Sequence, residues 1–222
     1  MRGLLIKDFQ IMAQQRKFLI LVMGISVVMG FSMGDTSFLM GYITLMCAML
    51  VLNTLSYDEY DNGYCFLFTL PITRKGYVLE KYVLAGIVSV CSWFVSVLLC
   101  MGIAIATTGS VNIGEMLAPA IITLLVCLLM LFVMMPVQMK YGSEKSRVVI
   151  VAIAGGIVLV CYLLKALSDK LQNVIAIDAE SMLLAISRLG EAGIIAIAVL
   201  IVAAIMAITM SISIKVMEKK QM

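Results

Sequence analysis

The sequence predicts an all-α integral membrane protein, a single domain over residues 1–222 with six transmembrane helices. Two observations predict this fold class. First, 63% of the 222 residues are hydrophobic, only 13% are charged, and the mean hydropathy is +1.12, whereas soluble domains are closer to half apolar and a quarter charged. Second, the apolar residues form long runs that short polar segments separate. Such a chain cannot cover its apolar surface in water, so a lipid bilayer is its natural solvent.

Composition also argues against several kinds of site. The chain has no histidine, and its six cysteines form no CxxC pair, so neither a metal centre nor a disulfide framework is expected. The net charge of +3 is small and the bases are scattered, so no nucleic-acid partner is expected. The Walker phosphate loop is missing, because Glu144 stands before Lys145 and Ser146 where that loop needs glycine. We therefore expect no enzyme activity and no cofactor in this chain.

Residues 1–17 alternate apolar and polar side chains at helical spacing, with Leu4 and Phe9 on one face and Lys7 and Asp8 on the other. This pattern predicts an amphipathic elbow helix that lies flat in the cytoplasmic headgroup region. A solvated leader is the alternative. Polar residues occur where a signal peptide needs its apolar core, so no cleaved signal is expected.

Six apolar runs follow, and each is predicted to cross the bilayer as a helix. They cover residues 18–33, 38–55, 83–107, 116–137, 147–164 and 192–214. Apart from Arg147 at the edge of the fifth run, none of them contains Asp, Glu, Lys or Arg. A charge at the middle of a bilayer costs at least ~2.5–3.5 kcal/mol, and ion-driven transporters keep such charges to bind their ions. The sequence therefore argues against a proton- or sodium-driven transporter.

The basic residues predict the orientation, because cytoplasmic segments of membrane proteins carry the excess of Lys and Arg. With both termini in the cytoplasm, thirteen basic residues lie inside and three, Lys165, Lys170 and Arg188, lie outside. The outer connection between the fifth and sixth spans has apolar residues at helical spacing after Asp178, which predicts a short extracellular amphipathic helix. An ordinary surface helix is the open alternative there.

The segment 56–82, between the second and third spans, differs from the rest of the chain. It contains four acids and three bases around an apolar, aromatic block at residues 64–70, and Pro71 follows that block. The proline ends a helix and fixes a turn, and Gly63 permits a sharp bend. An apolar block with charges of both signs around it is typical of a protein interface; a solvated loop would not need one.

This segment and the layout of the chain resemble the ABC-2-type transporter permeases, in particular the small bacterial six-span members. The resemblance covers the whole chain in layout and about thirty residues in motif. The motif residues are Asp58-Glu59-Tyr60-Asp61-Asn62-Gly63, Leu70-Pro71-Ile72-Thr73-Arg74 and Glu80-Lys81-Tyr82. The start of the chain, with Leu4, Leu5, Lys7 and Asp8, is also typical of this family.

The resemblance implies a permease subunit of an ATP-binding cassette exporter in the bacterial cytoplasmic membrane, with ATP and Mg²⁺ bound by a separate ATPase subunit. It also implies that segment 56–82 contains a coupling helix that docks on this ATPase. The residues expected to carry the coupling are Asp58, Glu59, Asp61, Gly63, Phe66, Leu67, Leu70, Pro71, Arg74 and Lys81. The second cytoplasmic connection is expected to make a minor contact through Lys140, Glu144 and Lys145.

The chain is expected to pair with a second permease, either a copy of itself or a sister subunit. Two ladders of small residues would let helices approach closely: Gly30 with Gly34, and Ala203 with Ala207 and Ser211. Relatives are associated with amphipathic or antimicrobial peptides, and the apolar spans fit such a cargo, or a lipid, better than a hydrophilic ion. The alternative function is a membrane scaffold or immunity protein that shields the membrane from a toxic peptide without ATP. A membrane enzyme is a third class, against which the missing catalytic residues argue.

Overall fold

The computed structural model describes residues 2–33, 36–60, 63–67, 69, 72–109, 113–171 and 190–219. Within these ranges the chain forms helices and no strands, as the fold class predicts. The helices are α1 (Arg2–Gln14), α2 (Arg16–Met33), α3 (Thr36–Glu59), α4 (Gly63–Leu67), α5 (Arg74–Thr108), α6 (Ile113–Leu171) and α8 (Gly190–Lys219). The predicted extracellular helix after Asp178 lies outside the described residues.

Four of the described helices are long and apolar enough to cross a bilayer. Their apolar stretches are Phe38–Glu59, Arg74–Thr107, Met116–Ser143 and Ile195–Lys219. They coincide with the second, third, fourth and sixth predicted spans. The first predicted span, 18–33, lies in α2, which qualifies only together with α1 across a bend of 59°. The fifth, 147–164, is helical as part of α6, and the count of six spans stays a prediction.

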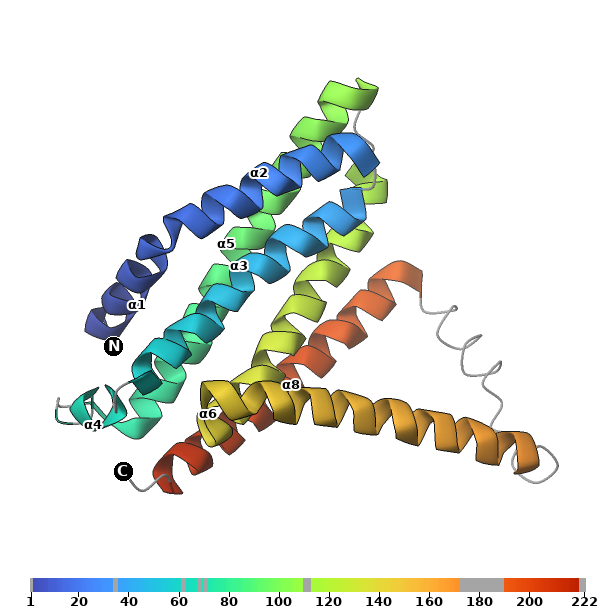
Figure 1. Cartoon of the computed structure of the whole chain (residues 1–222). Helices are drawn as coiled ribbons and strands as arrows, with labels where there is room; N and C mark the ends of the chain where they lie inside the picture. Colours follow the sequence, from blue (N-terminus) through green and yellow to red (C-terminus); the bar gives the residue numbers. More distant parts are fainter. Residues whose placement is uncertain are drawn as a thin grey trace.

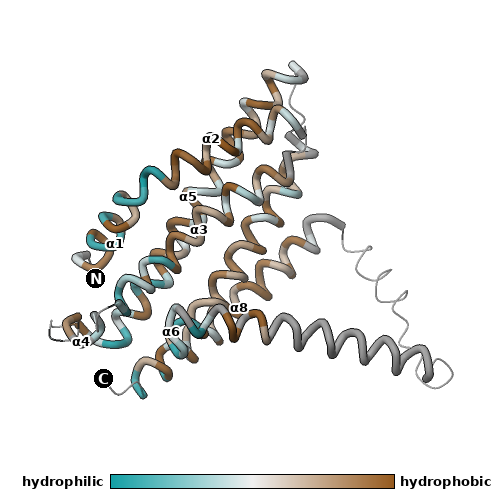
Figure 2. The backbone as a smooth tube through the Cα atoms, in the orientation of Figure 1, coloured by the Kyte–Doolittle hydropathy of each residue, from teal (hydrophilic) through white to brown (hydrophobic). Residues whose placement is uncertain are grey.

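The helices pack as a bundle in which α3 contacts α2, α5 and α6, and α8 contacts α5 and α6. Figure 1 shows α1, α4 and the last turns of α8 at one end of this bundle, which we call the α4 end. Hydrophilic residues gather on α1 and at the α4 end, while the middle of the helices is hydrophobic (Figure 2). The core between the helices is apolar, and Tyr82 of α5 stacks on Phe132 of α6 with ring centroids 5.6 Å apart.

The long helices change how segment 56–82 is built. It was expected to stand apart from the spans, yet α3 continues to Glu59 and α5 already begins at Arg74. At 1.5 Å per residue, the 35 residues of α5 extend about 52 Å, well beyond the ~30 Å of a hydrocarbon core. Thr73 caps this helix, because its side-chain oxygen accepts a hydrogen bond of 3.1 Å from the backbone of Gly76. The segment therefore consists of two helix ends with α4 between them.

The connection predicted at residues 138–146 is mostly helical. Helix α6 runs through it and is interrupted at Gly142, whose φ of 82° and ψ of 169° are not helical. Figure 1 shows that the second half of α6 leaves the bundle at a wide angle from this point. A single glycine thus makes the turn where the sequence predicted a short polar connection, because glycine adopts positive φ without steric cost.

Candidate functional site

The short helix α4 lies beside the ends of α3 and α5 and presents the side chain of Phe66 outward. Tyr64 and Leu67 are buried, whereas Phe66 is 73% exposed. The Tyr64 ring meets the Tyr77 ring of α5 edge-on, with centroids 6.0 Å apart. Burial raises the pKa of the Tyr64 phenol. Helix α4 is therefore attached to the bundle through one face and displays Phe66 on the other.

Gly63, the first residue of α4, lies directly against the end of α3. A Cβ atom at this position would come 2.6 Å from the backbone carbonyl oxygen of Asp58. Only glycine permits this close approach of the two backbones. Predicted from sequence as a bend, Gly63 also sets the distance between α4 and α3.

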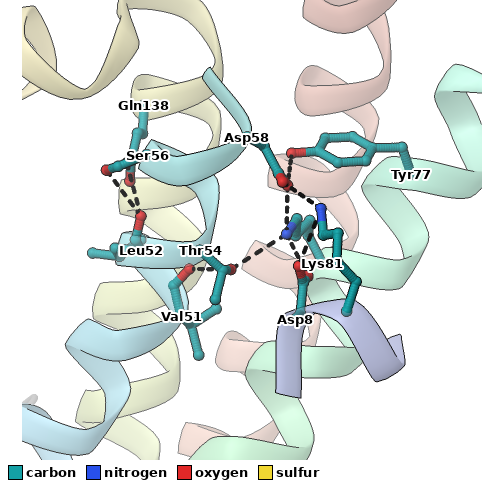
Figure 3. A network of polar contacts seen from close by, with 10 residues as sticks. Asp8, Val51, Leu52, Thr54, Ser56, Asp58, Tyr77, Lys81 and Gln138 are labelled. Atoms are coloured by element: carbon teal, nitrogen blue, oxygen red, sulfur yellow. Dashed lines mark hydrogen bonds and ion pairs between the residues drawn. The ribbon is translucent and has the colours of Figure 1, made fainter. Parts of the chain in front are cut away.

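A buried network of charges holds α1, α3 and α5 together at the α4 end (Figure 3). The Lys81 ammonium of α5 lies 2.7 Å from the Asp58 carboxylate of α3 and also pairs with Asp8 of α1. Lys7 of α1 pairs with Asp58 and lies 3.4 Å from Asp8. Tyr77 donates a hydrogen bond of 2.9 Å to Asp58. Three helices that are distant in sequence thus meet in one cluster of ion pairs.

The network is balanced in charge, with two lysines against two aspartates. Lys81 and Asp8 have no exposed side-chain area and Asp58 has 4%. Removing one member of such a buried pair leaves the other charge uncompensated, which typically costs about 3–5 kcal/mol. The network therefore fixes the positions of the three helices relative to one another, and with them the position of α4.

Glu80, beside this network on α5, has no such partner. It is 1% exposed, and neither of its carboxylate oxygens has a hydrogen-bond partner. One oxygen of Asp8 also lacks a hydrogen bond, although Lys7 lies 3.4 Å from it as an ion pair. The pairing of Asp8 with Lys81 still compensates the charge of Asp8. Among the described residues Glu80 forms no ion pair within 4 Å, although Lys81 is near enough to attract its carboxylate.

Glu59 follows Asp58 but contacts a different helix. Its carboxylate accepts a hydrogen bond of 2.7 Å from the backbone N–H of Ser143, the residue after the break in α6. On the near side of the break, the Gln138 side chain donates to the Leu52 carbonyl at 3.0 Å and to the Ser56 hydroxyl at 2.9 Å. The last turns of α3 therefore hold α6 on both sides of Gly142.

Arg74, at the start of α5, caps the C-terminal end of α8. Its guanidinium donates to the carbonyl of Met217 at 2.8 Å and to that of Glu218 at 2.9 Å. Lys75 adds an exposed ion pair with Glu218 at 3.6 Å. The last carbonyls of a helix lack partners within it, and a cation is favourable there. Segment 56–82, which includes parts of α3 and α5 and the whole of α4, thus also contacts α1, α6 and α8.

The structure describes seven of the ten predicted coupling residues, and six of them, all except Phe66, contact other parts of the same chain. Asp58, Glu59, Arg74 and Lys81 bind other parts of the same chain. Leu67 is buried and Phe66 is exposed. Asp61, Leu70 and Pro71 lie outside the described residues. Sequence reasoning missed Lys7, Asp8 and Tyr77. It placed Asp8 on the wet face of α1, and the structure corrects this, since Asp8 is buried.

The other predicted sites remain separate from this cluster. Lys140 and Lys145 are exposed beside the break in α6, with the Lys140 ammonium 4.9 Å from the centre of the Tyr141 ring; the side chain of Glu144 is not described. Gly30 is packed within the chain against Leu39 and Ile103, and Gly34 lies outside the described residues. Ala203, Ala207 and Ser211 are exposed along α8.

A groove of about 730 Å³ lies beside α4. Apolar side chains from α1 and α4, including Leu4, Phe66 and Leu67, form most of its wall, and Lys7 and Asp58 lie at it as well. Among the described residues, no three His, Cys, Asp or Glu side chains are placed to hold a metal ion.

Comparison with known proteins gives one match. A family model described as "ABC-2 family transporter protein" matches residues 3–218, nearly the whole chain. No curated protein and no solved structure matches.

Proposed function

We propose that this chain, which belongs to the ABC-2 family of transporter proteins, is the permease subunit of an exporter that a separate ATPase subunit drives. The observation that carries this proposal is the exposure of Phe66 on a helix attached to the rest of the bundle. A docking element must show side chains to its partner and must also be held firmly enough to pass a force on. Helix α4 meets both requirements.

The docking surface consists of Phe66 together with the exposed Tyr57 and Tyr60 at the end of α3. All three are aromatic and belong to α4 or to the adjoining end of α3, where hydrophilic residues gather (Figure 2). Aromatic side chains are enriched at the centres of protein interfaces and dominate their binding energy. The groove beside α4, with Leu4 and Leu67 in its wall, offers apolar surface next to Phe66 for the same partner.

The coupling route follows from what holds α4. Gly63 leaves no space between α4 and α3, and Tyr64 packs on Tyr77 of α5. A displacement of α4 therefore moves the ends of α3 and α5, and the pairing of Lys81 with Asp58 and Asp8 carries that movement to α1. In this proposal Asp58 and Lys81 act inside the permease and position α4, and Phe66 makes the contact with the ATPase.

The cargo we propose is an amphipathic or antimicrobial peptide, or a lipid-like molecule, exported across the bacterial cytoplasmic membrane with both termini of the chain in the cytoplasm. The apolar spans support a cargo of this kind. A second permease, either a copy of this chain or a sister subunit, would complete the pathway. The exposed small residues Ala203, Ala207 and Ser211 of α8 provide a surface on which two helices can approach closely.

Co-purification with a separate ATPase subunit tests the proposal. We expect the wild-type permease to retain an ATPase that has a Walker loop, and Phe66→Asp to lose it. Phe66→Ala should weaken the retention too, and Phe31→Ala is its matched control, because Phe31 is an exposed aromatic residue on α2 and alanine brings no charge into this predicted span. Candidate peptides should then stimulate ATP hydrolysis by the complex. A wild-type chain that purifies alone and stimulates no hydrolysis would instead support a scaffold or immunity protein.

A further inference from the structure

The break in α6 and the end of α3 fit each other closely. Gly142 has φ 82° and ψ 169°, a conformation that is essentially restricted to glycine. A Cβ atom on Gly142 would overlap the Oε1 atom of Glu59 and would lie 3.1 Å from its carboxyl carbon. The missing side chain of Gly142 thus leaves the space that the Glu59 carboxylate occupies.

Glu59 also accepts a hydrogen bond from the first turn of the helix that begins after the break in α6. The first N–H groups of a helix have no partner within it, and Ser143 donates its N–H to Glu59 at 2.7 Å. The helix dipole also favours a carboxylate at a helix N-terminus. The capping residue, Glu59, lies 84 positions away in the sequence and belongs to a different helix, α3.

A continuous α6 would use the same N–H differently. In an unbroken α-helix the N–H of residue 143 bonds to the carbonyl of residue 139, four positions earlier. Ser143 therefore has two alternative acceptors: Glu59 when α6 is bent, and the Met139 carbonyl when α6 is straight. Gln138 fixes the first half of α6 to α3 through Leu52 and Ser56, so a change between these two states moves the second half.

We infer that Glu59 is a positioning residue that holds α6 in its bent state, and that its release lets the helix straighten at Gly142. Asp58, the preceding residue, belongs to the buried ion network, and its carbonyl touches Gly63 of α4. A shift of α4 is thereby transmitted to Glu59 within one helical turn. The hinge depends only on contacts within this chain, whereas its role in transport rests on the proposed function.

The test is a distance measured between spin labels by electron paramagnetic resonance, on the full chain in lipid nanodiscs. Labelled non-natural residues at Phe94 of α5 and Val151 of α6, both exposed, leave the native cysteines in place. We expect one narrow distribution for the wild type. Glu59→Ala should shift its mean and broaden it, while Glu59→Gln, which keeps an acceptor oxygen, should retain the wild-type distance.

Gly142→Ala provides an independent variant. Alanine disfavours the positive φ and clashes with Glu59, so the distribution should shift in the same direction as for Glu59→Ala. Because both changes act on one hinge, the double variant should shift no further than either single one. Glu218→Ala is the matched control: it removes an exposed carboxylate at the same end of the bundle and should leave the distance unchanged.

A wild-type distribution in Glu59→Ala, or additive shifts in the double variant, would overturn the inference. If Glu59→Ala does not fold, Gly142→Ala decides alone, and an unchanged distance rejects the hinge. If the wild-type protein does not co-purify with an ATPase, that result counts against the proposed function and leaves the hinge standing. An unchanged distance in the Glu59→Ala and Gly142→Ala variants, with the ATPase still retained, would count against the hinge and leave the proposed function standing.

Discussion

The Lys81 ammonium and the Asp58 carboxylate lie 2.7 Å apart, and both side chains are almost completely shielded from solvent. Both belong to the segment from which the coupling function was predicted, yet they contact each other and α1 instead of a partner protein. Their expected contribution is therefore to stability and to the placement of α4, and each can be tested by substitution.

Replacing Lys81 by methionine should lower the free energy of unfolding by about 3–5 kcal/mol, because Asp58 and Asp8 both lose a buried cation. Thermal unfolding in detergent measures the effect as a fall in Tm. Lys75→Met is the control, since the Lys75–Glu218 pair is exposed and should contribute ~0–1 kcal/mol. Equal Tm values for the two variants would contradict the account of the network.

Gly63→Ala should destabilise the protein by about 1–3 kcal/mol and displace α4, since the added methyl group would lie 2.6 Å from the Asp58 carbonyl. Lower Tm and weaker ATPase retention are the expected results. Gly86→Ala serves as the comparison, because nothing lies within 4 Å of a Cβ at that helical position. That variant should gain roughly 0.5–1 kcal/mol from helix propensity, and a loss at Gly86 equal to that at Gly63 would rule out the close-contact explanation.

Glu80→Gln should leave Tm unchanged or raise it. The carboxyl of Glu80 is buried without a hydrogen-bond partner, and an ionised carboxylate there is costly to desolvate. The amide has the same shape and no charge. Glu80→Ala, which removes buried volume as well, should lower Tm; a clear loss of stability in Glu80→Gln would show that the charge of Glu80 is needed.

The orientation can be tested with Cys65. The other five cysteines lie in apolar runs, and Cys65 lies in segment 56–82. A membrane-impermeant maleimide should label it in inside-out vesicles and leave it unlabelled in intact cells. The Cys65→Ala variant identifies the background. Labelling of intact cells at this residue would reverse the predicted topology.

The sequence was sufficient for the helices and insufficient for their polar partners, for a physical reason. Apolar runs of transmembrane length are properties of neighbouring residues, so α3, α5, the first half of α6 and α8 were predictable. The pairing of Asp8 with Lys81 joins residues 73 positions apart, and no local pattern announces it. The lone break at Gly142 was hidden for another reason: glycine is common in membrane helices, and only its contact with Glu59 distinguishes this one.

The hydrogen bonds of Arg74 with the carbonyls of Met217 and Glu218 impose an order on biogenesis. The ribosome makes Arg74 early, but its acceptors, Met217 and Glu218, emerge only after α8 has left the exit tunnel. Until then the start of α5 makes no hydrogen bond with α8, although Asp8 of α1 and Asp58 of α3 are already available to pair with Lys81. The preceding helices can thus be inserted before α8 is made, while the contacts at the α4 end become complete only when α8 is in place.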